Sequence, residues 1–306
     1  MKLRSFLTAT AAAATLLTLG LPTAHAQPKY KDEYRLSVVL GTAFPWGKGA
    51  EIWADKVRER TDGRINIKLY PGTSLVQGDQ TREFSAIRQG VIDMAVGSTI
   101  NWSPQVKALN LFSLPFLFPD YAAVDAVVQG PVGEEIFKTI DKAGVLPLAG
   151  GENGYREISN SKRPITKPED LKGLKIRVVG SPLFLDTFTA LGANPTQMSW
   201  ADAQPAMASG AVDGQENPIP VYMAAKLNTV GQKYLTLWGD MNVPLSFGVN
   251  KDVWNSWTLE DQAIVKQAAL DAAKEQIAIS RKGTMEADKP LIKDLNALGV
   301  EVTDLT

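Results

Sequence analysis

Residues 171–218 restrict the fold more than any other part of the sequence, because they read as strand, helix, extended segment, helix and strand. The apolar run 174–179 predicts a buried strand. Gly180-Ser181-Pro182 predicts the start of a helix, with a cap followed by a proline in the first turn, and Gly192 predicts its end. The strand therefore carries Arg177 toward the start of a helix.

The second half of this stretch predicts another helix and strand. Residues 194–198 are expected to run extended. Ser199 with Asp202 three residues later resembles a helix-start box, and Gly210 predicts the end of that helix. A short strand and Asp213-Gly214-Gln215-Glu216-Asn217-Pro218 follow, so the strand carries the arginine toward the place where two helices begin.

The first half of the sequence repeats the alternation of strands and helices. Strands are predicted at 34–40, 64–70 and 91–96, and helices at 46–60 and 79–89. This order implies a mostly parallel sheet covered on both faces. Ligands of such folds bind beyond the carboxyl ends of the strands.

Two loops of this half are candidates for the ligand cleft, residues 42–47 after the first strand and 97–102 after the third. Trp46 and Trp102 either pack a helix end or form a stacking wall for a ligand. The loop side chains that can donate to ligand hydroxyls are Ser98, Thr99 and Asn101.

The following segment is the most hydrophobic part of the sequence after the N-terminal region. Residues 109–118 read LNLFSLPFLF, and their length and proline favour a buried connector over a membrane or partner contact. A helix is expected at 124–140 and a strand at 145–148.

The N-terminus has the features of a secretory signal peptide. Lys2 and Arg4 precede an apolar region at 6–21, and Ala24-His25-Ala26 is a small-x-small cleavage site. The apolar region is shorter than the roughly 18 residues of a membrane span. Residues 1–26 are therefore expected to be removed and the protein to be exported to the periplasm.

Composition excludes several classes of enzyme. The sequence has no cysteine, and its single histidine, His25, lies in the expected signal peptide. Thiol catalysis, zinc-thiolate sites and histidine general bases are thus excluded from the mature protein, which favours a binding protein without a cofactor. The formal net charge is −1 and no basic stripe is present, which argues against nucleic-acid binding.

Several blocks of the sequence, in the expected order, resemble the solute-binding proteins of tripartite ATP-independent periplasmic (TRAP) transporters, in the DctP-like family. The similarity extends over the whole mature chain, from the strand near Tyr34 to a strand near Val300. The blocks are Gly173-Leu174-Lys175-Ile176-Arg177-Val178, Leu191-Gly192-Ala193-Asn194-Pro195-Thr196, Met198-Ser199-Trp200 and Val212-Asp213-Gly214-Gln215-Glu216-Asn217-Pro218.

The resemblance implies a two-domain periplasmic binding protein fold of the α/β class, with mixed, mostly parallel sheets, a cleft between the domains and a long helix crossing both. A helical run at 258–282 matches that helix, and residues 242–250 would return the chain to the first domain. The expected division is residues 27–153 plus 243–282 for domain I and residues 154–242 plus 283–306 for domain II.

Two features depart from the family pattern. Pro205 lies inside the helix that begins at Ser199, where it removes a backbone donor and is expected to kink or shift the helix. The sequence ends at Thr306, just after a strand predicted at 300–302, whereas relatives usually continue with another helical segment. Both features bear on geometry more than on function.

The residues expected to hold the ligand centre on Arg177, which interrupts an apolar strand. Its guanidinium offers two parallel donors that match a carboxylate, and the family arginine at this position pairs with the ligand carboxylate. The resemblance implies that Arg156 reaches the ligand from the domain crossing and that Asn217 adds a donor. Glu216 is expected to orient an arginine, and Trp200 to form a cleft wall or pack in the core.

The ligand class follows from the neutral donors and the three tryptophans Trp46, Trp102 and Trp200. Stacking walls with neutral donors favour a sugar acid such as a uronate over a C4-dicarboxylate, with an aromatic acid third. The expected partners are the small and large TRAP membrane subunits, and the protein is expected to be a monomer. Which acid binds does not follow from the sequence.

Two other functions stay open at this point. The protein could serve a membrane sensor instead of a transporter, and a neighbouring pair of membrane-subunit genes would decide between them. A glycosidase needs only two carboxylates, but no acidic pair stands out in the sequence. Glycine-rich phosphate loops, GxSxG, HExxH and calcium-loop motifs are absent from the sequence.

Overall fold

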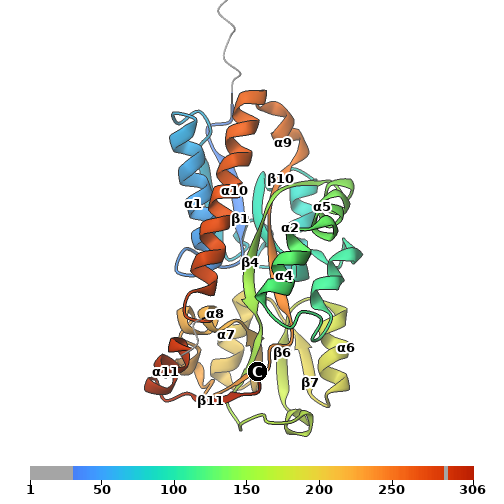
Figure 1. Cartoon of the computed structure of the whole chain (residues 1–306), viewed down its shortest axis with the longest axis vertical. Coiled ribbons are helices and arrows are strands. Elements are labelled where there is room, and N and C mark those ends of the chain that lie inside the picture. Colours follow the sequence, from blue (N-terminus) through green and yellow to red (C-terminus); the bar gives the residue numbers. More distant parts are fainter. Residues whose placement is uncertain (1–29, 286–288) are drawn as a thin grey trace, which may run out of the picture.

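The computed structural model describes residues 30–285 and 289–306, so the expected signal peptide at 1–26 lies outside the described residues. The chain forms two β-sheets with helices packed on them, and the two halves follow one another along the longest axis of the molecule (Figure 1). This confirms the predicted mixed α/β class. No helix in the described ranges is long and apolar enough to cross a membrane.

The first sheet has its strands in the order β2-β1-β3-β10-β4. Strands β1, β2 and β3 pair in parallel, whereas β10 is antiparallel to both β3 and β4. The late strand β10 thus returns to the first sheet, as predicted for residues 242–250. The bounds are Tyr34–Val38 for β1, Ile67–Pro71 for β2, Met94–Ser98 for β3, Val145–Tyr155 for β4 and Asn242–Asn250 for β10.

Helices cover both faces of the first sheet (Figure 1). One face packs against α1 and the long helix α10, and the other against α2 to α5. Helix α10 begins where the hydroxyl of Thr258 accepts from the N–H of Asp261, which caps its first turn. The bounds are Pro45–Arg60 for α1, Glu83–Arg88 for α2, Thr99–Trp102 for α3, Tyr121–Val128 for α4, Pro131–Lys142 for α5, Lys251–Ser256 for α9 and Leu259–Arg281 for α10, with 3₁₀ turns η1 Ser74–Val76, η2 Gln80–Arg82 and η3 Lys107–Ser113.

The second sheet has the order β11-β9-β5-β8-β6-β7. Strand β6 is parallel to β7 and β8, β9 is parallel to β11, and β5 is antiparallel to β8 and β9. The strands are β5 Glu157–Asn160, β6 Lys175–Val178, β7 Asn194–Gln197, β8 Gly214–Asn217, β9 Tyr234–Leu237 and β11 Glu301–Asp304; the helices are α6 Pro182–Ala190, α7 Trp200–Ser209, α8 Ile219–Ala224 and α11 Pro290–Ala297, with 3₁₀ turns η4 Pro168–Leu171 and η5 Leu227–Val230.

Some elements differ from the sequence prediction. The helix predicted at 79–89 begins as the 3₁₀ turn η2 before α2. The helix predicted at 124–140 is two helices, because Gly130 is extended and Pro131 cannot donate to the preceding turn, so it starts α5. Helix α7 continues past Pro205 to Ser209.

The hydrophobic segment at 109–118 is only partly a buried connector. Leu109, Phe112 and Phe118 are buried in the core of the first half. Leu114, Phe116 and Leu117 are exposed, Phe116 by 62%. The expectation of a wholly buried segment was therefore wrong for its middle, where the chain leaves the 3₁₀ turn η3 and the N–H of Phe116 donates to the carbonyl of Asp240.

The division into two domains stays a proposal. The first sheet holds β4 up to Tyr155, beyond the expected boundary at residue 153, and β5 already belongs to the second sheet. At this crossing, the N–H of Arg156 donates to the carbonyl of Met241, at 3.0 Å, so the outgoing and returning segments are bonded to each other. We call the two crossing segments, around Arg156 and Met241, the hinge region, because a movement of the two halves would have to occur there.

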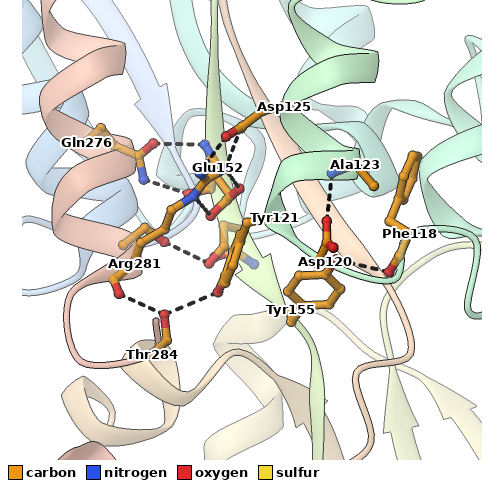
Figure 2. Close-up of polar contacts among 12 residues, drawn as sticks. Phe118, Asp120, Tyr121, Ala123, Asp125, Glu152, Tyr155, Gln276, Arg281 and Thr284 are labelled. Carbon is orange, nitrogen blue, oxygen red and sulfur yellow. Dashed lines mark hydrogen bonds and ion pairs between the residues drawn. The ribbon is translucent and has the colours of Figure 1, made fainter. Parts of the chain in front are cut away.

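Arg281, at the end of α10, ties this hinge region together (Figure 2). Its guanidinium donates to both carboxylate oxygens of Glu152 in β4, at 2.9 and 2.6 Å, and to both oxygens of Asp125 in α4, at 2.8 and 2.6 Å. It also lies 4.5 Å from the ring centre of Tyr121. The Glu152 side chain is only 3% exposed, and burial raises its pKa against the opposing effect of Arg281.

We expect Arg281→Met to lower the free energy of unfolding by about 3 kcal/mol, because it leaves Glu152 buried without its partner. Arg60→Met is the matched control. Arg60, at the end of α1, pairs with Asp271 of α10, and both side chains are about one third exposed. Exposed ion pairs contribute little, so this variant should stay close to the parent. Urea unfolding of the three proteins is the measurement, and equal losses for both variants would contradict the role of Arg281.

Candidate functional site

A small cavity lies between the two sheets, beyond the carboxyl ends of β1 and β3 on one side and of β6 and β8 on the other. Its volume is ≈ 20 Å³. This is close to the room that one water molecule needs, so the two halves are closed on each other. The lining residues are Val39, Leu40, Trp46, Gln80, Ser98, Ile100, Asn101, Arg156, Arg177, Val179, Trp200 and Asn217.

A larger cavity, of ≈ 240 Å³, lies beside the hinge region, lined in part by Tyr121, Tyr155 and Pro218. Volume alone would therefore not select the smaller cavity. The chemistry favours the smaller cavity, because that one is lined by Arg156 and Arg177, which are both buried. Buried charges occur where a partner of opposite charge is bound or paired.

Arg177 is the unusual residue of this cavity. It lies in β6, is 1% exposed, and donates from Nε and Nη2 to the carbonyl oxygen of Met198, at 3.0 and 2.8 Å. Burial lowers the pKa of Arg177 to about 10, with Glu216 opposing the shift and Arg156 adding to it. No carboxylate of the described residues lies within ion-pair distance of its guanidinium.

Arg156 differs from Arg177 because it has its own counter-ion. Its Nε is bonded to Oε2 of Glu216, and its Nη2 donates to the carbonyl of Glu216, at 2.7 Å. Both side chains are buried. Glu216 is absent from the cavity lining, so it lies where the sequence placed it, next to an arginine instead of in the cavity.

Asp240 adds a second buried acid to this cluster. Burial raises its pKa to about 7, with Glu216 adding to the shift and Arg156 opposing it. In the part of the chain that the structure describes, Oδ1 of Asp240 and Oε1 of Glu216 are buried without a hydrogen-bond partner. Below about pH 7, the Asp240 carboxyl group therefore keeps its proton.

The neutral polar residues of the site come from both halves. Asn217 ends β8 and donates from Nδ2 to Oε1 of Gln215, at 2.5 Å. Ser98 caps α3 by accepting from the N–H of Asn101, at 3.2 Å, and both residues line the cavity. Thr99 does not line it; its hydroxyl donates to the carbonyl of Pro244.

Two of the three predicted tryptophans line the cavity. The indole N–H of Trp46 donates to the carbonyl of Val96, at 2.6 Å, which fixes the ring at the start of α1. Trp200 is the first residue of α7, and the centre of its ring lies 5.7 Å from the guanidinium carbon of Arg177. The two rings thus come from different halves and both line the cavity.

Trp102 is placed differently from its predicted role. Its side chain is fully buried, donates to Oε2 of Glu83, at 3.1 Å, and packs edge-on against Phe84. A Cβ on Gly97 would lie 2.3 Å from the indole, so the ring rests directly on that glycine. Trp102 therefore belongs to the core of the first half and does not line the cavity.

The sequence reasoning missed the apolar lining and one amide. Val39 and Leu40 follow β1 and Val179 follows β6, so the rule that ligands lie beyond the carboxyl ends of strands would have selected them. Gln80 lies in the 3₁₀ turn η2 and carries no such signal, because its approach to the second half depends on tertiary contacts.

The site thus combines a buried guanidinium, neutral donors and apolar walls. Such a set can hold the carboxylate of a small organic molecule. Among the residues that the structure describes, no group of acidic or histidine side chains is arranged to hold a metal ion. Residues 36–306 match the family of bacterial extracellular solute-binding proteins, family 7.

The chain belongs to this family. It is a solute-binding protein of the TRAP type and not an enzyme. The 2,3-diketo-L-gulonate-binding periplasmic protein YiaO of Escherichia coli K12 is 35% identical over 257 residues, which cover 84% of this chain and 76% of the relative.

Solved structures of TRAP periplasmic solute-binding proteins have the same fold. One from Ralstonia eutropha H16, with bound (S)-2-acetolactate, is 73% identical, with a TM-score of 0.90 over 90% of this chain and 88% of that chain. One from Sulfitobacter sp. NAS-14.1, with bound β-D-galacturonate, is 30% identical, with a TM-score of 0.80 over 89% of this chain and 88% of that chain.

We expect Asp240 to make the solute-binding protein less stable as the pH rises. A carboxyl group with a raised pKa in the folded state binds its proton more tightly there than in the unfolded chain, so its contribution is lost between about pH 4 and the folded pKa near 7. Asp240→Asn removes this effect. Its free energy of unfolding should rise relative to the parent by up to about 1.4 kcal/mol per pH unit in that window.

Urea unfolding of both proteins at pH 5, 6, 7 and 8 is the measurement. Burial also raises the pKa of Glu83 to about 7, and this effect is the same in parent and variant, so it cancels in the difference. Burial is the main cause of the raised pKa of Glu157, about 7, and Asp240 adds to it, so only the share due to burial cancels. A stability difference that does not change with pH would contradict the assignment.

Proposed function

We propose that the protein is the periplasmic receptor of a TRAP transporter and binds a small organic acid through Arg177. One observation carries the proposal: a fully buried guanidinium lines the cavity, and none of the described carboxylates is paired with it. Burying an unpaired cation is costly, and a ligand carboxylate removes that cost. The acid would then be delivered to the membrane subunits of the transporter.

The remaining donors of Arg177 suit this role. Two of its N–H groups go to the carbonyl of Met198, which holds the guanidinium plane and leaves three N–H groups for other acceptors. Arg156 and Asn217 line the same cavity and can add donors beside the carboxylate. Glu216 neutralises Arg156, so the net positive charge offered to a ligand is that of one guanidinium.

This charge balance favours a monocarboxylate. A C4-dicarboxylate would bring a second negative charge, and the only other cation among the described lining residues is already paired with Glu216. An uncompensated second carboxylate would be costly to desolvate.

The size and lining of the cavity favour a short, branched hydroxy or oxo acid. Val39, Leu40, Ile100 and Val179 present apolar surface, and the closed cavity is only ≈ 20 Å³, so a ligand enters only when the halves move apart. The Ralstonia eutropha relative with bound (S)-2-acetolactate supports this class. The uronate preferred from the sequence, supported by the relative with bound galacturonate, is the second candidate.

A role in sensing would use the same binding site. The two roles differ in the partner, and finding genes for a small and a large TRAP membrane subunit beside this one would favour transport. The expected signal peptide and the periplasmic location named for the relatives support a periplasmic location for this protein.

We expect (S)-2-acetolactate to raise the melting temperature of the protein more than D-galacturonate and much more than succinate. A ligand at 100 times its dissociation constant stabilises by about 2.7 kcal/mol, which a thermal shift detects readily. The three acids are compared at equal concentration and pH. A shift with succinate alone would contradict the monocarboxylate class, and a larger shift with galacturonate would replace the branched acid by a uronate.

Arg177→Ala should weaken binding of the acid by roughly thirty-fold to several-thousand-fold, because it leaves the desolvated carboxylate unpaired. Arg177→Lys keeps the charge but loses the planar fork, so it should also bind more weakly than the parent. Arg58→Ala is the control, since Arg58 is exposed on α1 and pairs with Asp55. Calorimetry decides; affinities within about threefold of the parent for both Arg177 variants would refute the assignment.

A further inference from the structure

The turn η2 of the first half touches the second half directly beside the cavity. Gln80 is 4% exposed, and its Oε1 accepts from the backbone N–H of Trp200, the first residue of α7, at 3.0 Å. Its Nε2 donates to Oδ1 of Asn101, at 2.8 Å. One side chain therefore connects the start of a helix in the second half to a polar residue of the cavity.

The backbone N–H of Trp200 determines which way the side-chain amide of Gln80 is oriented. An N–H group can only donate, so the Gln80 oxygen must face Trp200 and its nitrogen must face Asn101. The oxygen of the Asn101 amide must then face Gln80. The Asn101 amide nitrogen is left as a donor, and it belongs to a residue that lines the cavity.

Thr81, the residue after Gln80, approaches the second half at Gly180. A Cβ placed on Gly180 would lie 2.2 Å from Cγ2 of Thr81, far closer than real carbon contacts. Gly180 lies two residues after the end of β6, the strand of Arg177, and before α6. Any larger residue at this position would collide with the Thr81 methyl group when the halves are closed.

The Thr81 methyl group has little freedom to move away. The hydroxyl of Thr81 donates to Oδ1 of Asp79, at 2.7 Å, which also accepts from the Thr81 N–H. The carbonyl of Thr81 accepts from Nε2 of Gln105. Both ends of the residue are thus held by its own half, and the methyl group stays directed at Gly180.

We propose that Gln80 and Thr81 form a closure latch, which docks on Trp200 and Gly180 when the protein closes on its ligand and sets the Asn101 amide as a donor to that ligand. The proposal rests on the proposed function, because it assigns positioning residues to the same acid-binding site. Neither Gly180 nor Thr81 lines the cavity. Substitutions at these two positions therefore change how the halves close without changing a direct contact with the ligand.

The steric half of the latch gives the sharpest test. Gly180→Ala should weaken binding of (S)-2-acetolactate, or of D-galacturonate if that acid binds more tightly, by at least tenfold. Thr81→Ser removes only Cγ2 and keeps the hydroxyl that bonds Asp79, so it should bind like the parent. The double variant should recover to within about threefold of the parent, because the collision is gone.

Gly150→Ala is the matched control. Its Cβ would meet the nearest atom at 3.4 Å, an ordinary contact, within β4 and away from the seam. It should bind the acid as the parent does. Melting temperatures without ligand should be similar for all variants, since moving the halves apart removes the collision without unfolding either half. Unchanged affinity of Gly180→Ala, or a loss that Thr81→Ser does not rescue, would overturn the latch.

Gln80→Met tests the polar half and keeps the latch testable without a ligand. It should weaken binding by about tenfold and speed hydrogen exchange of the Trp200 amide, whose acceptor it removes. If the parent binds none of the acids, the proposed function fails, and the latch is judged by this exchange alone. Equal exchange of the Trp200 amide in parent and variant would then overturn the latch.

Discussion

A guanidinium in a protein interior loses its hydration and needs compensation from its surroundings. Arg177 obtains part of it from the Met198 carbonyl and part from the face of Trp200, and these contacts fix its plane without neutralising its charge. Its strand places it in the cavity between the halves, and in the proposed function a bound molecule supplies the missing counter-charge. The neighbouring ion pair of Arg156 and Glu216 is already neutral, which leaves the charge of Arg177 to select the ligand.

The frame around this charge is built by segments that run between the two sheets. Strand β10 returns to the first sheet after β9, and Arg281 joins the end of α10 to β4, so each half is held to the hinge region by more than one segment. Such multiple connections restrict relative motion to a hinge. The closed arrangement can then be reproducible enough for a single amide, that of Gln80, to meet one backbone N–H of the opposite half.

Much of this could be predicted from the sequence, and the failures have physical causes. The strand of Arg177 and the helix after it follow from local patterns, and Trp46, Ser98 and Asn101 line the cavity because they follow the ends of strands. Trp102 follows a strand too, but α3 turns it onto Gly97 and into the core, which only packing decides. Gln80 could not be found, since its partner Trp200 is 120 residues away in the chain.

The enclosure of the cavity has a consequence for the timing of release. All its lining residues except Trp200 are buried, and they come from both halves. A molecule held there is surrounded mostly by these buried side chains, so we expect its release to follow the movement of the halves away from each other. Tight binding then requires the halves to open slowly, whereas rapid transfer of the bound molecule requires them to open quickly. A membrane partner that speeds opening would resolve this conflict without any contact with the bound molecule.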